Sequence, residues 1–222
     1  LTDRMNAPQT GPDDPQAPTD ADGGAPACVM SFNCSDPSGA SGVGADIATI
    51  AAMGAHALPV VTSLLIRDTA EVFESIEIEP EAIMEQARTI LEDVTVASWK
   101  VGFLGSAEAV SVVAEILSDY PDTPLVACLP NLSWMDEDAQ MAYLDAFREL
   151  ILPATYVLVG NHKTLTDFLL PEWEAERAPS SRELAVAASE LGASYVLVTG
   201  VQLPDQFIDN EIGRASCRER VS

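Results

Sequence analysis

The stretch Cys34-Ser-Asp-Pro-Ser-Gly-Ala-Ser-Gly-Val-Gly-Ala-Asp46 decides how the chain folds. It follows the apolar run Cys28–Phe32 and precedes the apolar-periodic segment Ile47–Met53, so the sequence predicts a strand, a tight turn and a helix. The small residues of the turn let a ligand approach the backbone, and the free N–H groups of the new helix face it. We expect Asp46, in the first helical turn, to accept hydrogen bonds from a neutral ligand. The alternative is an ordinary turn capped by Ser and Asp.

Two common phosphate-binding loops do not fit this stretch. A Walker A loop ends in Gly-Lys-Ser/Thr, and the chain has no lysine before Lys100. A Rossmann fingerprint requires a third glycine where Ile47 stands.

Composition limits the class of protein and its partners. The 222 residues are 47% hydrophobic, and 35 acidic side chains outnumber 11 Lys plus Arg for a net charge of −24. A polyanion would be repelled, so we expect neither a nucleic acid partner nor an anionic membrane surface. No apolar run approaches the roughly 18 residues that span a bilayer, and the N-terminal residues do not resemble a signal peptide. The cysteines lack metal-ligand spacing, which predicts reduced thiols in a cytoplasmic protein: Cys28, Cys34, Cys128 and Cys217.

Composition also divides the chain into three segments. Residues 1–26 are rich in Pro, Asp, Gly and Ala, which predicts a disordered tail. Residues 27–211 read as one folded domain. Residues 212–222 change composition abruptly, and we interpret them as a non-native read-through tail that replaces the end of the domain.

Apolar runs alternate with helical patterns through the domain. The predicted strands are 28–32, 57–65, 100–104, 124–128, 155–159 and 194–198, and the later predicted helices are 80–93, 107–118, 136–151, 163–170 and 182–192. Short β-branched strands separated by helices predict an α/β fold, with a mostly parallel sheet covered by helices on both faces. Ligands of such folds bind beyond the carboxyl ends of the strands. We therefore expect one crevice among the loops 34–46, 66–69, 102–106, 129–134, 160–164 and 199–205.

The motif Ser35–Asp46 resembles the Ser-Asp-Pro-Ser-Gly-Gly-Ala-Gly-Ile-Gln-Ala-Asp signature of the hydroxymethylpyrimidine/phosphomethylpyrimidine kinases of thiamine biosynthesis. Further matches follow in order, at 51–57, 61–64, 99–108, 159–161 and 195–200. The resemblance implies a three-layer αβα ribokinase-like fold whose last part is missing here. It also implies ATP- and Mg²⁺-dependent phosphorylation of the pyrimidine's hydroxymethyl group and then of the monophosphate, often by a homodimer.

The same resemblance points to five substrate-binding positions: Cys34, Ser41, Asp46, Arg67 and Phe103. Phe103 replaces a methionine that packs on the pyrimidine in the family, and an aromatic ring there can stack on the ligand; a plain core Phe is the alternative. Arg67 replaces a glutamine that hydrogen-bonds the pyrimidine. Because arginine has hydrogen-bond donors and no acceptor, we expect Arg67 to hydrogen-bond the ring differently from that glutamine.

For ATP or phosphate, the resemblance points to Asn161, Lys163 and Thr199. A surface role for Lys163 is the alternative. We assign no metal ligand, since 128–132 lacks the family's acid and Thr164 stands where its glutamate belongs. We also assign no catalytic residue, because the family's late Gly-x-Gly-Cys/Asp turn, which stabilises the transferring phosphoryl group, does not occur before Ile212.

Three functions remain open from the sequence. The first is a divergent pyrimidine kinase, although we do not expect this polypeptide alone to turn over substrate. The second is a non-catalytic relative that binds a pyrimidine. The third, suggested by Arg67, is a kinase for another small alcohol such as pyridoxal.

Overall fold

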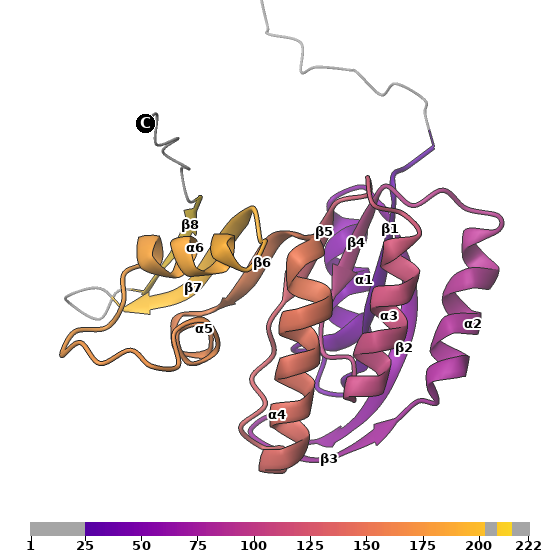
Figure 1. Cartoon of the computed structure of the whole chain (residues 1–222). Coiled ribbons are helices and arrows are strands. Elements are labelled where there is room, and N and C mark those ends of the chain that lie inside the picture. Colours follow the sequence, from indigo (N-terminus) through magenta and orange to yellow (C-terminus); the bar gives the residue numbers. More distant parts are fainter. Residues whose placement is uncertain (1–24, 203–207, 215–222) are drawn as a thin grey trace, which may run out of the picture.

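The structure is a computed structural model that describes residues 25–202 and 208–214. Within these residues eight strands form one sheet in the order β3-β2-β1-β4-β5-β6-β7-β8 (Figure 1). The strands are β1 (Cys28–Ser35), β2 (His56–Arg67), β3 (Val72–Glu77), β4 (Ser98–Val101), β5 (Leu125–Cys128), β6 (Thr155–Asn161), β7 (Tyr195–Gln202) and β8 (Ile208–Gly213). The predicted tail over 1–26 lies outside the described residues except for its last two, and so do residues 203–205 of the last predicted loop.

The six predicted strands are confirmed and pair in parallel, from β2 through β1, β4, β5 and β6 to β7. Two further strands, β3 and β8, were not predicted from the sequence; they pair antiparallel at the two edges of the sheet. An edge strand is paired with only one neighbour and is more exposed to solvent, so it needs fewer apolar residues. In agreement, β3 carries three charged or polar side chains in six positions. In β8, Ile212 and Gly213 pair with Leu197 and Val196 although we assigned them to the tail; residues 215–222 lie outside the described part.

Most of the helices agree with the predicted pattern within one or two residues at their ends. The first helix differs: it begins at Gly42 and not at Ile47, so the glycines at 42 and 44 are already helical and Asp46 lies in its second turn, not in the predicted first turn. The helices are α1 (Gly42–Ala52), α2 (Pro80–Leu91), α3 (Ala107–Ser118), α4 (Glu137–Ala146), α5 (His162–Leu169) and α6 (Ser181–Glu190). The helix predicted over 136–151 is α-helical only to Ala146. A π-helical turn, Phe147–Ile151, and a 3₁₀ turn, Leu152–Ala154, complete it, and Pro153 in the latter has no N–H for an α-helical bond.

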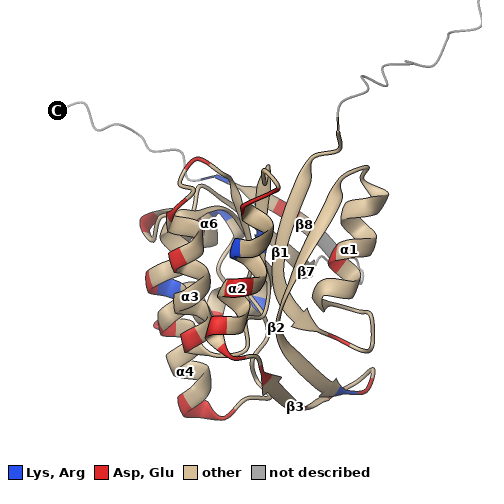
Figure 2. Cartoon of the chain, turned by 90° about the vertical axis from the view of Figure 1, so that its right-hand side faces the viewer, with Lys and Arg blue, Asp and Glu red and all other residues tan. Residues whose placement is uncertain are grey.

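Helices lie on both faces of the sheet, but unevenly. Figure 2 shows α2, α3, α4 and α6 on one side and α1 on the other. The fully buried core lies under the crowded side, around Trp99, Val101 and Leu158. On the α1 side the register places Lys100, Val126 and Val157 in one row, and all three are half-buried. The α1 face of the sheet is therefore less completely covered than the opposite face.

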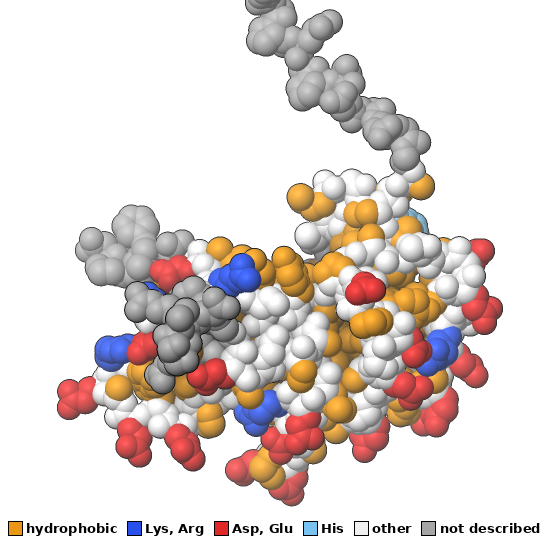
Figure 3. Space-filling view, turned by 45° about the horizontal axis from the view of Figure 1, so that its top comes forward, with side chains coloured by type: hydrophobic (Ala, Val, Ile, Leu, Met, Phe, Trp, Pro, Cys, Tyr) orange, Lys and Arg blue, Asp and Glu red, His pale blue; other side chains and the backbone are white. Residues whose placement is uncertain are grey.

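Acidic side chains gather at the periphery of the molecule, notably along the lower edge in Figure 3, whereas apolar and neutral groups cover the centre of that face. In the described part of the chain, no helix combines the length and the apolar character needed to span a membrane.

Candidate substrate pocket

A cavity of about 770 Å³ opens at the carboxyl ends of β1, β2, β4 and β5. These four strands end at one edge of the sheet because they run parallel, and chain order reverses here, with β1 between β2 and β4. The cavity is lined by all five predicted substrate residues: Cys34, Ser41, Asp46, Arg67 and Phe103. Among the described residues, neither the predicted loop 160–164 nor positions 199–202 of the last predicted loop contribute to this lining.

The turn between β1 and α1 is built on the buried carboxylate of Asp36. One oxygen accepts hydrogen bonds from the amide (2.8 Å) and hydroxyl (2.7 Å) of Ser38. The other accepts from the Ser41 hydroxyl at 2.6 Å and pairs with Arg67 Nη1 at 3.3 Å. Burial acts to raise the pKa of Asp36, but these hydrogen bonds and the Arg67 charge outweigh it, so the pKa lies below its usual range.

Gly42 closes the same turn. Its φ is +71°, and a Cβ there would lie 2.5 Å from the carbonyl oxygen of Cys34 and 2.9 Å from the Asp36 amide nitrogen. A glycine is therefore required for the backbone to fold back on β1 at this point. This close approach sets the direction in which α1 leaves the sheet and carries Asp46 into the cavity.

Asp46 is anchored through one carboxylate oxygen. Its Oδ2 accepts from Ser31 Oγ at 2.6 Å, Asn33 Nδ2 at 2.9 Å and Lys100 Nζ at 2.8 Å. Among the described residues nothing donates to Oδ1, which leaves that oxygen available to a ligand. Asp46 was predicted from the sequence as a ligand-binding residue, whereas Asn33 and Lys100 were not. The available signal was that Lys100, one of two lysines in the chain, lies in an otherwise apolar strand.

Two aromatic rings form an apolar wall of the cavity. Phe103 and Trp134 meet edge to face with ring centroids 5.6 Å apart. The backbone of Phe103 is held at both ends, because its N–H donates to Asn33 Oδ1 (3.0 Å) and its carbonyl accepts from Thr62 Oγ1 (2.9 Å). Trp134, which the sequence analysis did not single out, donates through Nε1 to the Asn131 carbonyl at 3.2 Å.

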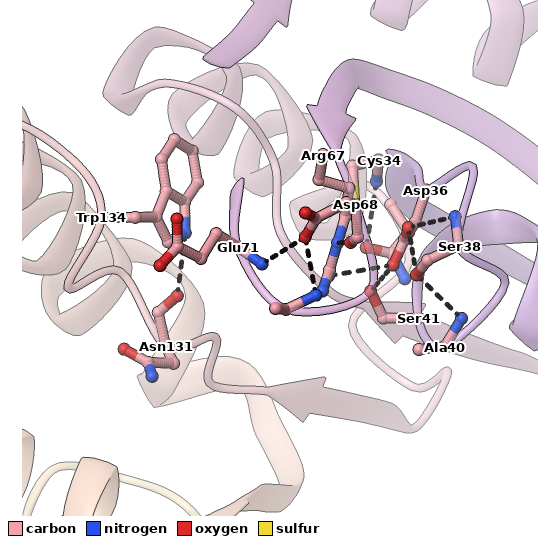
Figure 4. Close-up of polar contacts among 12 residues, drawn as sticks. Cys34, Asp36, Ser38, Ala40, Ser41, Arg67, Asp68, Glu71, Asn131 and Trp134 are labelled. Carbon is pink, nitrogen blue, oxygen red and sulfur yellow. Dashed lines mark hydrogen bonds and ion pairs between the residues drawn. The ribbon is translucent and has the colours of Figure 1, made fainter. Parts of the chain in front are cut away.

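The hairpin between β2 and β3 supplies the polar wall facing these rings. Asp68 Oδ1 accepts from the amides of Ala70 (2.7 Å) and Glu71 (2.8 Å), which fixes the bend, and Arg67 Nε donates to the Asp68 carbonyl at 2.8 Å. The Glu71 side chain extends from the hairpin toward Trp134 (Figure 4). Arg67 and Glu71 both line the cavity, so this wall offers donors and an acceptor.

The thiols in the cavity are not activated nucleophiles. Burial, with the nearby Asp36 carboxylate, raises the pKa of Cys34 to about 11, and burial also raises the pKa of Cys128. Both therefore remain protonated at neutral pH and line the pocket as small, weakly polar groups. The three described cysteines, Cys28, Cys34 and Cys128, are free, in agreement with the prediction of reduced thiols.

A second cavity of about 310 Å³ lies next to the first and shares Pro130, Asn131 and Ser133 with it. Two of the predicted phosphate residues, Asn161 and Lys163, line it, whereas Thr199 does not. Asn161 Oδ1 caps α5 by accepting from the Thr164 amide at 2.8 Å. Lys163 pairs with Asp167 one helical turn on and has an 83% exposed side chain. Thr199 donates its hydroxyl to the Gly160 carbonyl at 3.2 Å, which ties β7 to β6.

Comparison with known proteins places these features in a family. The family model described as phosphomethylpyrimidine kinase matches residues 36–217. The chain is 32% identical over 178 residues to the thiamine biosynthetic bifunctional enzyme TH1 of Arabidopsis thaliana, covering 80% of this chain and 34% of that protein. It is 30% identical over 186 residues to the hydroxymethylpyrimidine/phosphomethylpyrimidine kinase of Streptomyces coelicolor, covering 83% and 68%.

Solved structures share the fold. The phosphomethylpyrimidine kinase of Clostridium difficile superposes with a TM-score of 0.72 at 20% identity, covering 86% of this chain and 81% of that one. The pyridoxal kinase of Staphylococcus aureus superposes with a TM-score of 0.74 at 17% identity, covering 87% and 69%. The expected ribokinase-like α/β fold is therefore confirmed. The family match over most of the sequence is decisive: the chain belongs to the phosphomethylpyrimidine kinase family.

Proposed function

We propose that the larger cavity binds 4-amino-5-hydroxymethyl-2-methylpyrimidine, and that the whole protein phosphorylates its hydroxymethyl group and then the monophosphate with ATP. The observation that carries this proposal is the convergence of Asp46, Phe103 and Arg67 on one cavity of about 770 Å³ in a chain of this family. A cavity of this size accommodates a small heteroaromatic ring and its substituents.

The walls of the cavity match such a ligand in chemistry. Trp134 and the largely buried Phe103 form an apolar wall for a ring, and the free oxygen of Asp46 accepts from a hydroxyl or amino group. Arg67 donates to a ring nitrogen. These groups orient the alcohol so that its oxygen points toward the neighbouring cavity.

The second cavity is the proposed place for the nucleotide phosphates, with Asn161 and Lys163 as their contacts. Bound ATP supplies the phosphoryl group; the chain's own residues position the acceptor across the shared loop 130–133. Thr199 lies outside this lining, and its hydroxyl donates to the Gly160 carbonyl. The proposal therefore gives the Thr199 side chain no contact with phosphate.

Mg²⁺ belongs to the proposal through the family. Within the described ranges, no group of three or more His, Cys, Asp or Glu side chains is placed to hold a metal ion. Mg²⁺ at phosphate-transfer sites is held by one or two carboxylates together with substrate phosphates. We assign the ion no ligand among the described residues and no step.

The test is calorimetric titration of the 222-residue chain with the hydroxymethylpyrimidine and, separately, with pyridoxal. We expect saturable heat with the pyrimidine. The Asp46→Ala variant should bind about 10- to 100-fold more weakly, because a ligand acceptor is lost and Lys100 loses its partner. Ser111→Ala, on the exposed face of α3, serves as the matched control and should bind like wild type. Heat with pyridoxal and none with the pyrimidine would overturn the proposal.

Two other functions have an observation in their favour. Arg67 favours a different small alcohol such as pyridoxal, since its donors cannot accept from an amino group. The second cavity favours a non-catalytic pyrimidine binder. Its lining carboxylate, Asp167, is already paired with Lys163, so neither charge is free to serve a nucleotide or its metal ion. ATP binding by the whole protein, or its absence, separates this binder from a kinase.

A cytoplasmic homodimer completes the proposal. The three described thiols are free, as a reducing compartment maintains them. Leu64 and Ile76 face each other across β2 and β3, and both are more than a third exposed, as is Ile66 on the same strand face. Sedimentation equilibrium should give a dimer for wild type and a monomer for Ile76→Glu; a monomeric wild type would contradict this part.

A further inference from the structure

Asn33 lies where the polar and aromatic halves of the cavity meet. It is the sixth residue of β1 and 4% exposed, and its side chain contacts groups from α1 and from the segment after β4. A buried side-chain amide is costly unless its donors and acceptor are satisfied. What Asn33 satisfies is therefore informative about the site.

The side-chain oxygen of Asn33 accepts from two backbone amides, those of Cys34 and Phe103, each at 3.0 Å. Its side-chain nitrogen donates to Asp46 Oδ2 at 2.9 Å. The opposite amide orientation would place NH₂ against two N–H donors and an oxygen against a carboxylate. This pattern therefore permits one orientation of the amide.

Close packing transmits this orientation to the aromatic wall. A Cβ on Gly102 would lie 2.3 Å from Asn33 Oδ1 and 2.6 Å from Nδ2, so the backbone before Phe103 lies directly on the amide. Any rotation of Asn33 must displace either residues 102–103 or the Asp46 carboxylate.

We propose that Asn33 is a positioning residue that fixes Asp46 and Phe103 relative to each other, so that the acceptor and the ring face of the pocket act as one unit. This inference rests on the proposed function, since it takes the cavity as the ligand site. Asn33 itself need not touch the ligand. Lys100 and Ser31 hold Asp46, and Thr62 holds Phe103, but none of these three bonds joins the two.

The first test is a double-mutant cycle in ligand binding, with the hydroxymethylpyrimidine as probe. With Asn33 present, the effects of Asp46→Ala and Phe103→Leu on affinity should be coupled. The loss of affinity in the double variant should then be at least about fivefold smaller than the product of the losses in the two single variants. In the Asn33→Ala background the losses should multiply within about twofold. Thr62→Val is the control: it removes a bond to Phe103 and should leave the coupling in place. Coupling that persists in Asn33→Ala would overturn the proposal.

The second test uses the isosteric variant Asn33→Asp. When protonated, the new carboxyl donates to Asp46 and accepts from Phe103 N–H as the amide does. When ionised, it faces the Asp46 carboxylate. Burial and Asp46 raise the pKa of this carboxyl, Lys100 lowers it, and the protonated thiols of Cys34 and Cys128 carry no charge. Binding should approach wild type at acid pH and weaken as pH rises, whereas a structural defect would persist at every pH. A pH profile that parallels wild type would contradict the proposed role.

A ligand-free measurement separates this inference from the proposed function. The Trp134 indole N–H, assigned with Trp134→Phe, reports on the ring packed against Phe103. In ¹⁵N-correlated spectra Asp46→Ala should shift this signal, and Asn33→Ala should abolish the shift while the chain remains folded. If wild type does not bind the pyrimidine, the proposed function fails, and this spectrum alone decides the role of Asn33.

Discussion

At the scale of single residues, the turn beside the pocket depends on Asp36, whose hydrogen-bond partners and the Arg67 charge keep its pKa low. Asp36 is enclosed, yet each oxygen accepts two bonds, so its burial does not leave an unpaired charge. The result is a firmly bonded turn, which places Ser41 and Arg67 in the lining of the cavity.

Asp36→Asn should lower the free energy of unfolding by about 1–3 kcal/mol at neutral pH, because the new NH₂ cannot accept from Ser41 or Arg67. The folded-state pKa of Asp36 is depressed, so its stabilisation is present above the unfolded pKa of about 4 and is lost as pH falls through the folded value. Urea unfolding at neutral pH and at about pH 3 should therefore show the difference between wild type and variant shrinking in acid. An equal difference at both pH values would contradict this account.

Gly102→Ala should destabilise the chain by about 1–3 kcal/mol and weaken pyrimidine binding, because its Cβ would overlap the Asn33 amide. Gly44→Ala is the matched control. Apart from the backbone of α1 itself and the two chain neighbours, no atom lies within 4 Å of a Cβ at Gly44, so alanine should stabilise the helix by about 0.5–1 kcal/mol. Thermal unfolding and calorimetry on both variants check this; equal effects would show that the close approach at Gly102 is unimportant.

At the scale of elements, helix starts follow local side-chain chemistry. Ser106 caps α3, with its hydroxyl accepting from the Ala109 amide at 3.3 Å. Ser106→Ala should cost about 0.5–2 kcal/mol in unfolding free energy. Ser111→Ala, later in the same helix, should change it by less than about 0.5 kcal/mol. Denaturant titration of the two variants tests the cap, and a Ser106→Ala chain as stable as Ser111→Ala would refute it.

The elements also show what a sequence can predict. The six parallel strands were predictable because burial on both faces demands continuous apolar runs. Helix α3 has the predicted bounds, since a cap and an apolar period mark it. Strands β3 and β8 have no such signature at the sheet edges. Asn33 and Lys100 escaped prediction because their roles depend on partners 13 and 54 positions away.

At the scale of the whole molecule, the unequal helical layers explain where the pocket lies. The chain turns one way from β1 through α1 to β2 and the other way from β4 onward, so its crossovers lie on opposite faces. The two loop systems separate at the carboxyl end of β1 and leave the cavity between them. The same topology puts the second cavity beside β6, one loop away.

The scarcity of lysine gives the pocket a chemical reporter. The chain carries two, and their surroundings differ: Lys163 is 83% exposed, whereas Lys100 is 18% exposed and bound to Asp46. An acetylating reagent should therefore modify Lys163 first and Lys100 slowly, and a ligand that occupies the pocket should shield Lys100 further. Peptide mass spectrometry of a time course, with and without the pyrimidine, would then report pocket occupancy through the rate at which the Lys100 amine is acetylated. Equal acetylation rates for the two lysines would show that Lys100 is not enclosed.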